Sequence, residues 1–75
     1  MDNILYVDDR YESTELIELL DRTYVDYEIR SECEARRKGY KNLPLLVVDG
    51  KAMEFKKAKR YARERVIPND NTIYN

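Results

Sequence analysis

Apolar and polar residues follow one another along this chain in patterns that predict short strands and helices. Residues 3–7 and 43–48 are nearly continuous apolar runs, which are typical of central strands buried on both faces. Residues 24–30 alternate between polar and apolar side chains, with the two-residue period of a half-buried strand. These three segments are expected to be strands of a sheet.

Three helices are expected between and after these strands. Residues 11–22 and 55–65 place apolar side chains at positions i, i+3, i+4 and i+7, which is the repeat of a helix with one buried face. Residues 32–38 form a shorter helical segment with a weak apolar face. Pro68 ends the last helical pattern, because proline cannot continue a helix.

Local signals indicate where these helices begin and end. Asp9 with Glu12, and Ser31 with Glu34, have the spacing of a capping box at a helix start. Gly39 is placed to end the short helix, since glycine readily adopts the left-handed conformation found just after a helix.

A hairpin is expected where the apolar run 43–48 is followed by Asp49-Gly50, the strongest short-range hairpin signal, and by a return strand over residues 51–54. The predicted order is therefore β-α-β-α-β-β-α. This order predicts an α/β domain with a mixed four-stranded sheet and helices on both faces. The domain is expected to span residues 1–68, followed by a polar C-terminal tail over residues 69–75.

Three stretches of the chain together resemble a known family. They are the first strand with the helix that ends in Leu19-Leu20, the stretch Tyr27-Glu-Ile-Arg30, and the stretch Leu43-Pro-Leu-Leu-Val-Val-Asp-Gly-Lys51. In motif and in element order, residues 3–65 are similar to the glutaredoxin-like branch of the thioredoxin fold. The resemblance implies the thioredoxin fold and a cis peptide bond at Leu43-Pro44, facing the loop that holds the family's active site.

The chain departs from this family at the positions that carry its chemistry. The family has Cys-x-x-Cys or Cys-x-x-Ser between the first strand and the first helix, where this chain has Asp8-Asp9-Arg10-Tyr11-Glu12-Ser13-Thr14. The family's reaction requires a thiolate at the helix N-terminus. A basic residue after the first strand and a glycine-rich turn after the hairpin, which help to bind glutathione in the family, are also missing here. We therefore expect neither glutathione nor another cofactor.

The composition excludes further kinds of chemistry. Of the 75 residues, one is a cysteine, Cys33, and none is a histidine. The chain therefore cannot form an intramolecular disulfide, use histidine-assisted catalysis or supply a Cys/His zinc site. A single free thiol is typical of a reducing compartment. Because the first residues are unlike a signal peptide and no run of about 20 apolar residues occurs, we expect a cytoplasmic protein without a membrane span.

The charge is divided unevenly between the two halves of the chain. Residues 1–29 hold two basic and nine acidic side chains, whereas residues 30–65 hold twelve basic and five acidic ones, so the two parts carry −7 and +7. One interpretation is that the halves are neighbours in the fold and balance each other. The other interpretation is a binding surface for an acidic partner.

These observations predict a redox-inactive, non-enzymatic protein-binding module. Tyr11 stands where the family has its active loop, and tyrosine is enriched at protein interfaces. Its acidic neighbours favour a basic protein partner. The compact size is similar to that of viral and mobile-element relatives of the family. The predicted contact surface consists of Asp8, Asp9, Arg10, Tyr11, Ser13, Leu43 and Pro44.

Two alternatives from other functional classes are left open by the sequence. One is a thiol-dependent oxidoreductase that uses Cys33. The other is nucleic-acid binding through the basic C-terminal half, which includes Tyr40 and Tyr61, although a solvated helix face is the commoner explanation of such a run. The acids Asp8, Asp9 and Glu12 have oxygen ligands suited to magnesium, but capping already explains the last two, so no metal is expected.

Overall fold

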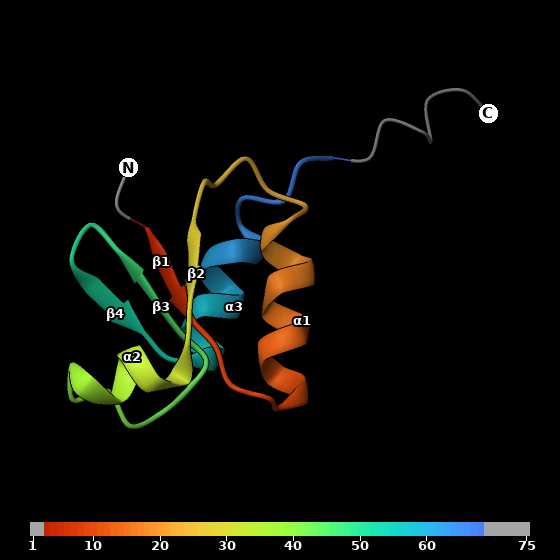
Figure 1. Cartoon of the computed structure of the whole chain (residues 1–75). Helices are drawn as coiled ribbons and strands as arrows, with labels where there is room; N and C mark the ends of the chain where they lie inside the picture. The colour runs from red at the N-terminus through yellow and green to blue at the C-terminus, as the bar shows by residue number, and fades with distance from the viewer. Residues whose placement is uncertain (1–2, 69–75) are drawn as a thin grey trace.

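The structure, a computed structural model, describes residues 3–68 and contains the predicted order of elements (Figure 1). The predicted tail, residues 69–75, lies outside the described residues. The elements are β1 (Ile4–Tyr6), α1 (Tyr11–Leu20), β2 (Glu28–Arg30), α2 (Glu32–Arg37), β3 (Leu45–Val48), β4 (Lys51–Met53) and α3 (Phe55–Arg63).

The four strands form one mixed sheet in the order β2-β1-β3-β4, which confirms the predicted α/β sheet. β1 runs parallel to β2, with Leu5 opposite Ile29, and antiparallel to β3, with Leu5 opposite Leu46. β4 pairs with β3 in an antiparallel hairpin. The two apolar runs of the sequence are therefore the central strands, and β2 and β4 are the edges.

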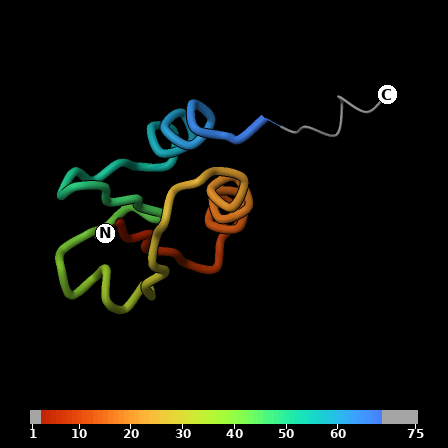
Figure 2. Tube along the Cα trace, turned by 90° about the horizontal axis from the view of Figure 1, so that it is seen from above, coloured from red at the N-terminus to blue at the C-terminus, as the bar shows by residue number. Residues whose placement is uncertain are grey.

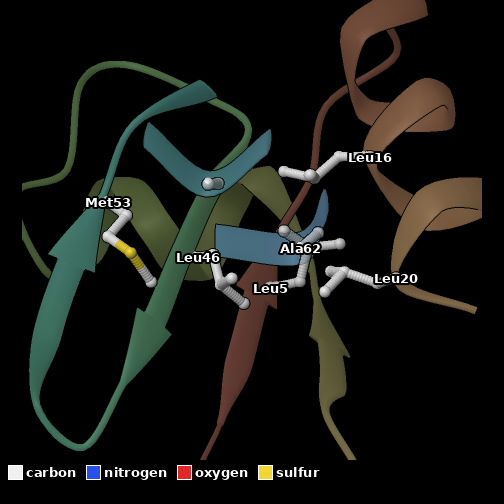
Figure 3. Packing of buried hydrophobic residues seen from close by; sticks show 7 residues of the cluster. Leu5, Leu16, Leu20, Leu46, Met53 and Ala62 are labelled. Atoms are coloured by element: carbon white, nitrogen blue, oxygen red, sulfur yellow. The ribbon is translucent and has the colours of Figure 1, made fainter. Parts of the chain in front are cut away.

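Helices cover both faces of this sheet, as the sequence predicts (Figure 2). Because successive side chains of a strand point to opposite faces, Leu5 and Leu46 lie on the face covered by α1 and α3. Figure 3 shows their side chains directed toward Leu16, Leu20 and Ala62 of these helices. The larger cluster of buried residues consists of Leu5, Leu16, Leu20, Leu46, Met53, Ala58 and Ala62.

The opposite face is covered by α2. There Tyr6 and Leu45, the neighbours of the two central leucines along their strands, pack with Ala35 and Leu43 in a second buried cluster. The ring of Tyr40 lies against that of Tyr6, with 5.2 Å between centroids. The sheet is therefore buried on both faces at its centre, which explains why β1 and β3 have nearly continuous apolar sequences.

The acidic first helix and the basic last helix are neighbours, as one interpretation of the charge division predicts. α1 and α3 pack side by side on the same face of the sheet (Figure 2). The ammonium group of Lys59 lies 3.0 Å from the carboxylate of Glu15, in a partly buried pair between the two helices.

The chain reversals follow the local predictions. Asp49 and Gly50 both have positive φ, at 51° and 80°, as a two-residue type I′ hairpin requires. Gly39, with φ of 88°, directly follows the C-cap of α2. The Leu43-Pro44 peptide bond is cis, as the family resemblance implies.

One of the two predicted capping boxes is wrong. The N-cap of α1 is Arg10, without a side-chain cap, so Asp9 and Glu12 do not form the expected box. Ser31 does cap α2, since its hydroxyl accepts a hydrogen bond from the amide of Glu34 at 3.2 Å. The carboxylate of Glu34 pairs with Arg30 at 2.9 Å.

The strand predicted over residues 24–30 is also too long, because only Glu28–Arg30 pairs with β1. After α1, the hydroxyl of Thr23 donates to the carbonyl of Leu20 at 2.6 Å and accepts from the amide of Val25 at 3.1 Å. This turn holds the chain away from the sheet until residue 28. Tyr24, the first residue of the predicted strand, is 71% exposed.

The central packing gives a direct stability test. Leu46→Ala should lower the free energy of unfolding by about 2–5 kcal/mol, because it removes a fully buried side chain from the centre of the larger cluster. Urea unfolding followed by circular dichroism measures this loss. Val47→Ala on the same strand is the control, since Val47 is only partly buried. A smaller loss for Leu46→Ala than for Val47→Ala would contradict this packing.

Candidate functional site

The loop between β1 and α1, residues 7–10, contains the best-defined polar network of the predicted site. The hydroxyl of Ser13 donates to the Asp8 carboxylate at 2.8 Å and accepts from the amide of Asp8 at 3.0 Å. The same carboxylate accepts from the amide of Arg10 and pairs with its guanidinium, both at 3.1 Å. Ser13 is buried and the Asp8 side chain is 5% exposed, so these two residues connect the loop to the first turn of the helix.

The surroundings of Asp8 lower the pKa of its carboxyl group. Burial raises this pKa. The Ser13 hydroxyl, the Arg10 amide and the Arg10 guanidinium together lower it by more than burial raises it, so it lies below the ordinary value of 3.8. Asp8 is therefore a charged acceptor that organises the loop before α1, whose N-cap residue, Arg10, provides no side-chain cap.

The remaining predicted site residues differ in exposure. Leu43 and Pro44 are buried, Leu43 in the cluster beneath α2, so they offer little surface to a partner. Asp9 and Arg10 are exposed, and Tyr11 is 74% exposed at the first position of α1. The solvent-facing part of the predicted surface thus consists of Asp9, Arg10 and Tyr11.

Cys33, the thiol of the oxidoreductase alternative, is exposed on α2. Its sulfur lies 3.7 Å from a guanidinium nitrogen of Arg37, one turn further along the helix. α2 covers the face of the sheet opposite to α1 (Figure 2), so the thiol and the loop before α1 belong to different layers of the protein.

Five of the twelve basic side chains of residues 30–65 lie on α3. Lys56, Arg60 and Arg63 are exposed and follow one another at i, i+4 and i+7, so they share one face of the helix. The two tyrosines of the nucleic-acid alternative already have partners within the chain: Arg65 lies over the ring of Tyr61 at 3.7 Å, and Tyr40, on the opposite face of the sheet, packs on Tyr6. This face therefore presents cations without free aromatic rings on which bases could stack.

Sequence reasoning missed the free edge of β2. The alternating pattern places Ile29 on the inner face of a half-buried strand, yet the structure leaves Ile29 48% exposed. No local signal marks such a residue, because the order of strands in the sheet decides which strand is an edge.

The hollows beside β2 and between β4 and α3 are open to solvent. Within residues 3–68, no three Asp, Glu or Cys side chains lie close enough together to hold a metal ion. No helix in this part of the chain is long and apolar enough to cross a membrane. Comparison of the chain with family models, with curated proteins and with solved structures finds no match.

The Asp8 network predicts a specific pH dependence of stability. Asp8→Asn should lower the free energy of unfolding at neutral pH by about 1–3 kcal/mol, because a buried, charged acceptor is lost. The folded-state pKa lies below the unfolded-state value of about 3.8, so this contribution is complete above that value and is lost as the pH falls through the folded-state pKa. Urea unfolding over a pH series should show the wild type and the variant converging in acid. Asp26→Asn, which changes an exposed carboxylate, is the control; a constant difference at all pH values would disprove this role of Asp8.

Proposed function

We propose that this chain is a redox-inactive, glutaredoxin-like member of the thioredoxin fold that acts as a protein-binding module without enzymatic activity. The element order, the mixed four-stranded sheet and the helices on both faces support the fold assignment. The family resemblance of residues 3–65 supplies the rest of that assignment.

The observation that carries the proposal is the exposure of Tyr11 at the start of α1, directly after a loop that has no thiol. A large aromatic side chain that is 74% exposed leaves apolar surface in water, which contact with a partner removes. Tyrosine also contributes strongly at interfaces because its large surface is ordered at a low cost in entropy.

The Asp8 network prepares this tyrosine for binding. Asp8, Arg10 and Ser13 tie together the residues on both sides of Tyr11, so the loop keeps its shape before a partner arrives. A preorganised loop loses less conformational entropy on binding. Asp9, which is exposed next to this network, gives the surface an acidic side that suits a basic partner.

The same contacts argue against catalysis in this loop. Ser13, whose hydroxyl occupies a position near the family's thiols, is buried and donates a hydrogen bond to the Asp8 carboxylate. The chain has no histidine to act as a base toward it. Cys33 lies on another helix, with a guanidinium group as its described polar contact.

Binding is tested with a displayed library of random peptides, selected against the immobilised full chain. We expect the selected peptides to be basic, and Tyr11→Ala to weaken their binding by about tenfold or more, because the removal of an interface tyrosine typically costs about 2 kcal/mol. Affinities are measured by isothermal titration calorimetry.

Tyr24→Ala is the matched control, since Tyr24 is 71% exposed and lies beyond the other end of α1. Asp9→Lys should weaken the binding of the same peptides. Glu18→Lys, which changes an exposed acid elsewhere on α1, should leave their binding unchanged. Equal affinities for Tyr11→Ala and Tyr24→Ala would show that the interface lies elsewhere.

The oxidoreductase alternative is tested separately. With glutathione and a small mixed disulfide as substrates, we expect no turnover above the uncatalysed rate, because the thiolate position at the start of α1 has no cysteine. Activity that is present in the wild type and lost in Cys33→Ser would overturn the proposal and assign the reaction to α2.

A further inference from the structure

β2 presents a free strand edge whose backbone groups are available for pairing. The amide of Glu28 donates to the carbonyl of Asn3 at 2.9 Å, and the amide of Val7 donates to the carbonyl of Arg30 at 3.1 Å. Glu28 and Arg30 therefore direct their backbone groups toward β1. Because these groups alternate in direction along a strand, the N–H and C=O of Ile29 point to the opposite side, where the sheet has no further strand.

An open, shallow hollow lies beside this edge and provides apolar contacts. The side chain of Ile29 is on the same face of the sheet as that of Leu5, its partner on β1, and it is 48% exposed. Val25 and Tyr27 are partly buried next to it. The hollow is lined by Asp21, Val25, Asp26, Tyr27, Glu28 and Ile29.

The rim of this hollow is acidic. The carboxylate of Asp21 accepts a hydrogen bond from the Tyr27 hydroxyl at 2.7 Å, and burial of that ring, with the Asp21 carboxylate, raises the pKa of Tyr27. Among residues 3–68, neither Asp21 nor Asp26 forms an ion pair with a basic side chain. Two carboxylates without a cation thus flank an exposed isoleucine and a free edge.

We propose that the free edge of β2 binds an extended segment of a partner protein in which basic side chains stand two residues before and two residues after an apolar one, so that all three face the hollow. The segment adds a strand to the sheet through the N–H and C=O of Ile29, as in other complexes formed by strand addition. Its apolar side chain packs on Ile29 and Val25, and its basic side chains meet Asp21 and Asp26.

The other edge of the sheet does not fit the same ligand. β4 carries Lys51, and the charged residues that line the hollow it shares with α3 are two lysines, Lys51 and Lys57, and one carboxylate, Asp49. This excess of positive charge is unfavourable for a basic segment. The charge around the two edges therefore directs a basic strand to β2.

This surface is distinct from the one around Tyr11. Tyr11 begins α1, at its lower end in Figure 1, whereas Asp21 follows the upper end and leads toward β2. The inference therefore does not rest on the proposed function of the loop before α1, and the two surfaces are tested with different variants.

The experiment uses the isotope-labelled full chain and three capped peptides. They are Lys-Thr-Val-Thr-Lys, its counterpart with Glu in place of Lys, and the Lys peptide with alternate backbone nitrogens methylated. Amide proton–nitrogen correlation spectra should show the Lys peptide shifting the resonances of Ile29, Asp26 and Asp21. The Glu peptide should bind at least about tenfold more weakly because it repels these acids. The methylated peptide should not bind, since it cannot form the ladder.

Protein variants complete the test. Ile29→Pro removes the edge-facing N–H but no hydrogen bond to β1, a substitution that edge strands tolerate, and it should abolish binding of the Lys peptide. Asp26→Lys should lower the affinity for the Lys peptide by about tenfold. Its control, Glu12→Lys at the opposite end of α1, should leave the affinity unchanged. Tyr11→Ala should also leave it unchanged, so that the two surfaces are separated.

Several outcomes would overturn the proposal. Equal binding of the methylated peptide, or resonance shifts confined to β4 or to Tyr11, would exclude strand addition at β2. Sedimentation of the free chain detects a second copy at this edge: a concentration-dependent dimer that Ile29→Pro abolishes would assign the edge to self-association. If the spectrum of Ile29→Pro shows that this variant does not fold, the comparison of the methylated and unmethylated peptides on the wild-type chain tests strand addition instead.

Discussion

The antiparallel pairing of β1 with β3 positions every other element of this protein. In this register Leu5 lies opposite Leu46, and both are fully buried against α1 and α3, while Tyr6 lies opposite Leu45 beneath α2. A shift of one residue would reverse which side chains meet which helices, so packing on both faces selects a single register. In a chain of 75 residues with no intramolecular disulfide, this pair of strands supplies four of the eleven buried hydrophobic residues in the described part of the chain, on both faces of the sheet.

This central pair also determines which surfaces are free. With β1 and β3 in the middle, β2 and β4 are the edges, and the loop before α1 lies at the end of β1. The face that holds Leu5 brings the acidic α1 beside the basic α3, and the Glu15–Lys59 pair lies between them. Part of the uneven charge along the sequence is thus balanced within one layer of helices, whereas Asp21 and Asp26, which precede β2, form no ion pair within residues 3–68.

The two proposed surfaces expose apolar groups to solvent for different reasons. Around Tyr11, the Asp8–Ser13 network holds the loop between the first strand and the first helix, which has no thiol. At β2, an exposed Ile29 and outward-facing backbone groups remain because residues 3–68 provide no strand beyond it. Each surface combines apolar contact area with nearby carboxylates, and each therefore favours a basic partner.

The sequence by itself determined the features that depend on neighbouring residues: the types and order of the elements, the Asp49-Gly50 turn and the end of α2 at Gly39. These follow from side-chain period and from backbone conformations that few residues adopt. Only the tertiary structure decided that Asp8 would organise the loop before α1, and that Ile29 would stay exposed. Burial and pairing depend on which distant segments pack together, and local patterns do not contain that information.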